Sequence, residues 1–165
     1  MLVLAACGPL ENRGPQLQFN FVLSALLADS IAKLQISIVT KGRSLGDGDC
    51  VKVQTTCLVN QLPADRFVPV RDAKGNEVRA VVVDLDVKPV GVNSSQQVVV
   101  QGIPLGKDYG LVIEALSKDS PPMLAGSSCN YLQEINPGAN PEKLAVTIRP
   151  LSPPVNCDPR VDKTK

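Results

Sequence analysis

The residues best suited to chemistry in this chain are its five cysteines, because the 165-residue sequence contains no histidine. Histidine is the usual general base at neutral pH and the commonest neutral metal ligand, so most hydrolytic and metal sites lose their customary residue. A cysteine thiol can be acylated, oxidised to a disulfide or bound to zinc. Position and spacing decide between these fates for Cys7, Cys50, Cys57, Cys129 and Cys157.

Cys7 ends a run of six apolar or small residues that begins at Met1. The run is far shorter than the about 20 residues that cross a bilayer, and it ends in small residues, as a secretory signal does at its cleavage point. The segment Leu4-Ala5-Ala6-Cys7 resembles the lipobox of bacterial lipoproteins. The resemblance implies cleavage before Cys7 and attachment of a diacylglycerol, with palmitate-like acyl chains, to its thiol. The alternative is a chance occurrence of these residues at the start of a soluble chain.

Lipidation would make the membrane the first partner of this chain, because each methylene of a buried acyl chain contributes about 0.8 kcal/mol to membrane binding. Gly8 follows the cysteine, and in the lipoprotein family an Asp at this position is associated with retention at the inner membrane. We therefore expect a cell-envelope protein anchored at the outer membrane and facing the periplasm or the exterior. Residues 1–6 are then a signal-peptide remnant, and residues 7–16 comprise the lipidated cysteine and a flexible tether.

The other four cysteines predict two disulfides, because an exported protein with an even number of cysteines commonly oxidises them in pairs. Three connectivities are open, and the shortest loops favour Cys50–Cys57 and Cys129–Cys157. The second bridge would clip a Pro-rich tail to the body and add about 3 kcal/mol of stability. The alternative is a zinc site, but the paired CxxC knuckles typical of such sites are missing, so we expect no metal here.

Ser127 and Ser128, in the segment Gly126–Cys129, come nearest to a catalytic nucleophile. Neither a GxSxG elbow nor a histidine base accompanies them, and nothing in the spacing joins them to Lys118 or Lys143. We therefore expect both serines to be loop residues beside a disulfide and the chain not to be an enzyme. A hydrolase that works without histidine is the less favoured alternative.

Neither the acidic residues nor the net charge of the chain indicates a metal-binding or nucleic-acid-binding site. Asp84 and Asp86 lie two residues apart in a β pattern, so both should face solvent on one side of a strand. A weak calcium site with Asp47 and Asp49 is the sharper interpretation, but no EF-hand loop is present, and we expect neither metal nor cofactor. The 17 basic and 16 acidic residues nearly cancel and aromatics make up 3 %, a composition that excludes a typical nucleic-acid binder.

Alternating apolar residues between frequent Pro and Gly turns predict seven or eight short strands. Apolar residues at helical spacing in 23–34 allow at most one short helix. We expect one all-β domain over residues 17–150, an antiparallel sandwich of immunoglobulin-like or transthyretin-like type, followed by a Pro-rich tail at 151–165. The candidate segments, from which seven or eight strands are expected, lie at residues 17–21, 34–38, 51–55, 66–70, 77–87, 96–103, 109–116, 130–135 and 144–148.

The segment Gly102–Tyr109, with the letters GIPLGKDY and the apolar run Leu111–Ala115 after it, carries a second resemblance. It is similar to a stretch of carboxypeptidase regulatory-like and transthyretin-like β-sandwiches. In those domains a Pro–Gly turn leads into a strand whose first aromatic residue closes one end of the core. The resemblance implies a structural or binding unit rather than a catalyst.

These features together predict a lipid-anchored envelope protein that acts as a non-catalytic interaction or structural module, with an envelope protein as its partner. Loops on rigid sandwiches commonly carry binding, so we expect the presented surfaces to be the loop Gly42–Asp49 and the Pro121-Pro122 region. A small-ligand carrier with a pocket in its core is the alternative.

Overall fold

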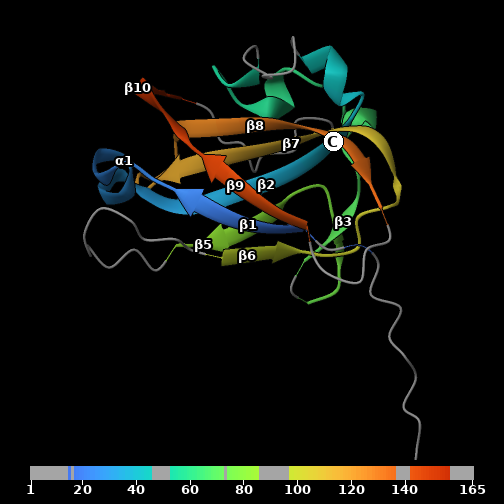
Figure 1. Ribbon diagram of the computed structural model, residues 1–165. Helices are drawn as coiled ribbons and strands as arrows, with labels where there is room; N and C mark the ends of the chain where they lie inside the picture. The colour runs from blue at the N-terminus through green and yellow to red at the C-terminus, as the bar shows by residue number, and fades with distance from the viewer. Residues whose placement is uncertain are drawn as a thin grey trace, which may run out of the picture.

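The structure, a computed structural model, describes residue 15 and residues 17–45, 53–72, 74–85, 97–136 and 142–156. Its strands form two facing sheets, with one short α-helix at one end (Figure 1). The predicted all-β sandwich is confirmed. In chain order the elements, with η for a 3-10 helix, are β1 (Leu17–Val22), α1 (Ala25–Ser30), β2 (Ile31–Thr40), η1 (Gly42–Leu45), η3 (Leu58–Asn60), η4 (Ala64–Arg66), β3 (Val70–Arg71), β4 (Glu77–Val78), β5 (Val81–Asp84), β6 (Gln97–Val100), β7 (Gly106–Ser117), β8 (Leu124–Ile135), β9 (Glu142–Thr147) and β10 (Arg149–Val155).

The large sheet has five strands in the order β10-β8-β7-β2-β5, and the small sheet has three in the order β6-β1-β9. The strands β3 and β4 form a separate hairpin. All pairs are antiparallel except β1 and β9, which run parallel. This parallel pair departs from the purely antiparallel sandwich that we expected. Between β1 and β9 the chain passes through strands of the large sheet, and β9 then returns to the small sheet beside β1.

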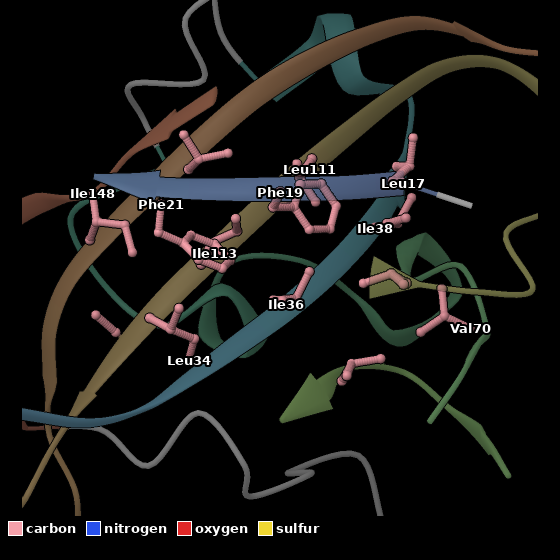
Figure 2. Packing of buried hydrophobic residues seen from close by; sticks show 14 of the residues in the cluster. Leu17, Phe19, Phe21, Leu34, Ile36, Ile38, Val70, Leu111, Ile113 and Ile148 are labelled. Carbon is pink, nitrogen blue, oxygen red and sulfur yellow. The ribbon is translucent and has the colours of Figure 1, made fainter. Parts of the chain in front are cut away.

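The hydrophobic core fills the space between the two sheets (Figure 2). On β1 the alternating residues Leu17, Phe19 and Phe21 are each at most 1 % exposed. They face the large sheet, where Ile36 of β2 and Ile113 of β7 are cross-strand partners and equally buried. Alternation with period two is what a strand with one buried face requires, which is why the sequence predicts this strand correctly.

Tyr109 belongs to the same core and is 7 % exposed, as expected for the first aromatic residue after the turn at Pro104. Its ring lies against Gly106 at the start of β7. A Cβ atom at Gly106 would lie 2.5 Å from the Tyr109 hydroxyl oxygen, so the close packing of this ring favours glycine here.

Helix α1 begins where the alternating pattern breaks. The Ser24 hydroxyl accepts a hydrogen bond from the Leu27 N–H, the usual arrangement of an N-cap. Leu27 packs into the core, and β2 starts immediately after the helix at Ile31. The short helix that helical spacing allows is therefore present. The strand expected over 34–38 is also present, but it begins earlier, because Ile31 belongs to β2 rather than to the helix.

Four expected elements differ from the structure. The strand expected over 66–70 is instead the end of η4, an isolated bridge at Phe67 and the start of β3. The strand expected over 77–87 is split into β4 and β5, because the chain bends after Val78. Residues 53–56 of the strand expected over 51–55 form a short 3-10 turn and a bend instead. The tail expected from residue 151 is also wrong at its start, because β10 continues to Val155 and pairs with β8. The domain therefore extends past its expected boundary at residue 150.

Candidate functional site

Four polar side chains lie buried on the face of the large sheet that points away from the small sheet. We call Gln35, Ser37, Glu114 and Ser127 the polar layer, and each of them is at most 3 % exposed. Gln35 of β2 lies opposite Glu114 of β7, which in turn lies opposite Ser127 of β8. Among the described residues, Ser37 Oγ is buried without a hydrogen-bond partner. Because these side chains are buried too, the large sheet is covered on both faces.

Residues 53–67, which include η3 and η4, cover this second face, and we call them the cover segment. Leu58 packs against Val112 of β7 in an apolar cluster separate from the main core. The Ser127 hydroxyl donates a 3.1 Å hydrogen bond to the carbonyl oxygen of Gln54. The cover segment is thus held to the sheet by both apolar contacts and hydrogen bonds.

The C-terminal end of the cover segment is fastened to β2. Arg66 donates hydrogen bonds of 3.1 Å from Nε and 2.8 Å from a terminal nitrogen to the carbonyl oxygen of Thr40. Within the segment, the Gln61 side chain donates to the carbonyl oxygens of Val53 and Thr56. Side chains therefore replace the backbone ladder that a strand would have used to satisfy these carbonyl groups.

Glu114 links the sheet to the cover segment at the centre of the polar layer. Its Oε1 accepts a 2.7 Å hydrogen bond from the Leu58 N–H, and its Oε2 accepts a 3.0 Å hydrogen bond from Gln35 Nε2. Burial raises the pKa of Glu114 to about 7, although both hydrogen bonds act in the opposite direction. A carboxyl group in this position changes charge near neutral pH.

Cys57 and Cys129 are both disulfide-bonded and buried. They sit in two different apolar clusters, Cys57 with Leu124 and Cys129 with Val112. Cys7, Cys50 and Cys157 lie outside the described residues. Lipidation of Cys7 and the pairing of the other cysteines therefore stay predictions.

A surface groove of about 520 Å³ lies between β8 and β9, and its lining is mainly polar. The strand β9 belongs to the small sheet and runs obliquely to β8 (Figure 1). The cover segment contributes one lining residue, Gln54. The lining consists of Gln54, Ser128, Cys129, Asn130, Tyr131, Leu132, Leu144, Ala145, Thr147 and Arg149.

The groove exists because the chain changes sheets at this point. β9 ends at Thr147, the buried Ile148 follows, and β10 then pairs with β8 in the large sheet. That pairing starts opposite Ser127 and runs away from the groove. Among the described strands, none pairs with the outer edge of β8 over 130–135, so part of that edge opens into the groove.

Tyr131 and Arg43 form the rim of the groove on the side of η1. The Arg43 guanidinium lies 5.8 Å from the centre of the Tyr131 ring, and it donates a 3.5 Å hydrogen bond to the Tyr131 hydroxyl. The Arg43 N–H donates a 2.8 Å hydrogen bond to Asp108 Oδ1. Arg43 belongs to the loop Gly42–Asp49, which the sequence predicts to be a binding surface. The described part of that loop therefore lies beside the groove.

The remaining sequence-based site residues do not converge. Asp84 is exposed on β5 and pairs with Lys33 at 3.0 Å, as a solvated strand face should, whereas Asp86, Asp47 and Asp49 lie outside the described residues. Ser127 and Ser128 are buried in β8. The expectation that they are loop residues is therefore wrong. In the sequence this part of β8 appears only as a run of small and polar residues, and such a run does not predict a buried strand.

Pro121 and Pro122, the second expected loop, form the turn between β7 and β8, at the opposite end of β8 from Tyr131. They take no part in the groove lining. The expected loop residues Gly42 and Leu45 are buried against β7, while Gly46–Asp49 lie outside the described residues. Of the two loops, only the first therefore lies beside the groove.

Sequence reasoning missed Glu114. A signal was available: Glu114 is the single charged residue in the run Leu111–Leu116, which is otherwise apolar on both faces of the strand. Such a run indicates a strand buried on both sides, and a charge within it must be buried and hydrogen-bonded.

Within the described parts of the chain, no group of three or more His, Cys, Asp or Glu residues is placed to hold a metal ion. No helix in those parts is both long and apolar enough to cross a membrane. Comparison with known proteins found no protein family, no curated protein and no solved structure that matches this chain.

Proposed function

We propose that this chain is a lipid-anchored, non-catalytic binding module of the cell envelope. In this proposal it receives an extended segment of a partner protein in the groove between β8 and β9. The observation that carries the proposal is the groove itself, which lies along part of the outer edge of β8. An extended peptide can add to such an edge through main-chain hydrogen bonds, with side-chain pockets providing selectivity.

The groove lining suits a polypeptide better than an apolar ligand. Asn130 and Thr147 offer hydrogen bonds on opposite walls, Tyr131 offers a partly buried aromatic ring, and exposed Arg149 adds a positive charge. Exposed edges of this kind invite pairing with another chain. Tyrosine and arginine are also the residue types that most often dominate binding at protein interfaces.

The anchor in this proposal is a diacylglycerol on Cys7, supported by the lipobox-like segment Leu4–Cys7. Residues 8–16 would then separate the sandwich from the outer membrane. The intact mass of the protein, produced in a bacterial envelope with a complete secretory signal, tests this part. A mass for a chain that begins at acylated Cys7 supports the anchor, and an unmodified cysteine contradicts it.

A photo-crosslinking experiment tests binding in the groove. A benzophenone amino acid replaces Thr147, an exposed residue of the groove wall, and in a matched protein it replaces Val82, which is 43 % exposed on β5 at the other edge of the large sheet. We expect an adduct from position 147 whose fragment spectra define one partner segment, and none from position 82.

A blocking substitution makes the experiment specific. Ala145 is exposed and lines the groove, so Ala145→Trp fills the groove without disturbing the core. We expect it to abolish the adduct from position 147, while the control Val82→Trp leaves the adduct unchanged. Equal adducts from both positions, or an adduct that survives Ala145→Trp, would contradict binding in the groove.

A further inference from the structure

Glu114 stands apart from every other ionisable residue that the structure describes. It is the only charged side chain among them that is buried, at 1 % exposure. The groove does not include Glu114, and sandwich packing alone does not require a carboxyl group at the centre of a strand. A carboxyl group retained in a buried position calls for a role.

The contacts of Glu114 indicate that its role is to hold the cover segment. Leu58 is the first residue of η3, and the residue before it, Cys57, provides no side-chain cap for that helix. The first N–H groups of a helix need an outside acceptor, and Glu114 Oε1 supplies it to Leu58 at 2.7 Å. The same carboxyl group binds Gln35 on β2 through Oε2. Glu114 is therefore a direct link between the middle of the large sheet and the cover segment.

Among the residues that the structure describes, the side chains that face Glu114 carry no charge that could compensate it. Gln35 and Ser37 face it from β2, Ser127 from β8, and Leu58 from the cover segment, and none of these side chains ionises. Cys57 and Cys129 do not titrate because they are disulfide-bonded. The causes of its raised pKa are burial and two hydrogen bonds, with no contribution from another charge.

We propose that Glu114 is a pH-sensitive latch: its neutral carboxyl group holds the cover segment on the sheet, and its ionisation loosens that segment. The carboxylate needs water, which it can reach only when residues 53–67 separate from β7 and β8. The separation is local, because Arg66 still fastens the C-terminal end of the cover segment to Thr40 of β2. This inference stands whether or not the groove binds a partner.

Loosening the cover segment would also change the groove. Gln54 contributes to the groove lining, and its carbonyl oxygen is held by Ser127, the neighbour of Glu114 across β7 and β8. An opening that releases Leu58 therefore frees a wall of the groove only four residues away in sequence. The latch thus makes the shape of the groove depend on pH between mildly acidic and mildly alkaline conditions.

Hydrogen–deuterium exchange of the full chain tests the latch. With a pKa of about 7 in the closed state and 4.5 in the open state, the opening equilibrium should rise about tenfold between pH 6 and pH 8. We expect this rise, after correction for intrinsic exchange rates, in peptides from residues 53–67. Peptides from the β3–β4 hairpin, which does not contact Glu114, should show no such rise.

Two variants separate the latch from general effects of pH. Glu114→Gln keeps the shape and the acceptor oxygen for the Leu58 N–H, and its amide nitrogen can donate to the Gln35 side-chain oxygen once the Gln35 amide is flipped. Because this variant cannot ionise, its exchange in residues 53–67 should not change with pH. Glu134→Gln removes a half-exposed carboxylate of β8 that pairs with Lys107 at 3.5 Å, and it should behave like the unmodified protein. A tenfold rise that persists in Glu114→Gln would overturn the proposal.

A measurement on the unmodified protein keeps the test valid if Glu114→Gln does not fold. In a chain labelled with ¹⁵N-leucine, the Leu58 amide resonance reports the ionisation of the carboxyl group that it contacts. We expect its chemical shift to titrate with a midpoint of about 7. A midpoint near the ordinary glutamate value of 4.5 would mean that Glu114 is ionised while the cover segment stays closed, and the latch would be refuted.

Discussion

The disulfide connectivity of this protein can be predicted from the two clusters that hold its described cysteines. Cys57 packs with Val155, which precedes Cys157 by two residues. Cys129 packs with Val53, which follows Cys50 by three residues. Two residues of chain span at most about 7 Å and three about 10 Å. We therefore expect the pairs Cys57–Cys157 and Cys50–Cys129, rather than the pairs between nearest neighbours in sequence.

The two connectivities differ in their expected effect on stability. The pairs Cys57–Cys157 and Cys50–Cys129 close loops of about 100 and about 80 residues, and chain entropy assigns them about 4.7 and about 4.5 kcal/mol. The short-loop pairs Cys50–Cys57 and Cys129–Cys157 would close about 8 and about 29 residues, worth about 2.5 and about 3.6 kcal/mol. Removing Cys57 and Cys157 together should thus lower the free energy of unfolding by about 4.7 kcal/mol.

Tryptic digestion without reduction, followed by mass spectrometry, distinguishes the two connectivities. Cleavage after Arg43, Lys52, Arg66, Lys118, Lys143 and Arg160 places each of the four cysteines on its own peptide. We expect peptide 53–66 linked to peptide 144–160, and peptide 44–52 linked to peptide 119–143. A link between peptides 44–52 and 53–66 would refute the reasoning from packing.

Three further predictions concern stability. Phe19→Ala should lower the free energy of unfolding by about 3–5 kcal/mol in urea titrations. The control Leu105→Ala changes a side chain that is 52 % exposed, so its free energy of unfolding should lie within about 0.5 kcal/mol of the unmodified protein. Equal losses of stability in the two variants would mean that the core is not where we place it. Gly42→Ala should lower the melting temperature and the free energy of unfolding by about 1–3 kcal/mol, because its Cβ would meet the backbone of Tyr109; an unchanged melting temperature would show that η1 does not pack on β7. The pKa of Glu114 is raised on folding from 4.5 to about 7, so its stabilising effect is complete below pH 4.5 and lost as pH rises through 7. Relative to Glu114→Gln, the unmodified protein should lose about 3 kcal/mol across that range, and parallel pH profiles would contradict the burial of this carboxyl group.

Strands with one buried face could be recognised from the sequence. Leu17, Phe19 and Phe21 alternate with polar residues, and β1 forms with these three side chains in the core. Val81 and Val83 share the core side of β5, as their alternation predicts. Period-two patterns are local, because each residue needs only its immediate neighbours to show which face is apolar.

The candidate site was hidden because it depends on burial of both faces. Ser127 and Ser128 lie in a run of small and polar residues that carries no strand signal, yet both are buried in β8. The cover segment covers Ser127, whereas Ser128, the next residue of the strand, points to the opposite face of the sheet. The alternation at Val53 suggested a strand of its own, but that residue packs onto the large sheet from a 3-10 turn. Which segment covers which face is a long-range property that local patterns do not contain.

The sequence alone predicted the class of fold of this protein correctly. Its aliphatic alternation and its Pro and Gly turns specify a β-sandwich, and the absence of histidine removes the commonest catalytic groups. Three features became visible only in the folded chain: residues 53–67 cover the large sheet, the Leu58 N–H of that segment binds Glu114, and a groove opens between β8 and β9. The physical reason is that desolvation, pairing across sheets and the opening of an edge all arise between residues far apart in the chain, and sequence patterns report only on near neighbours.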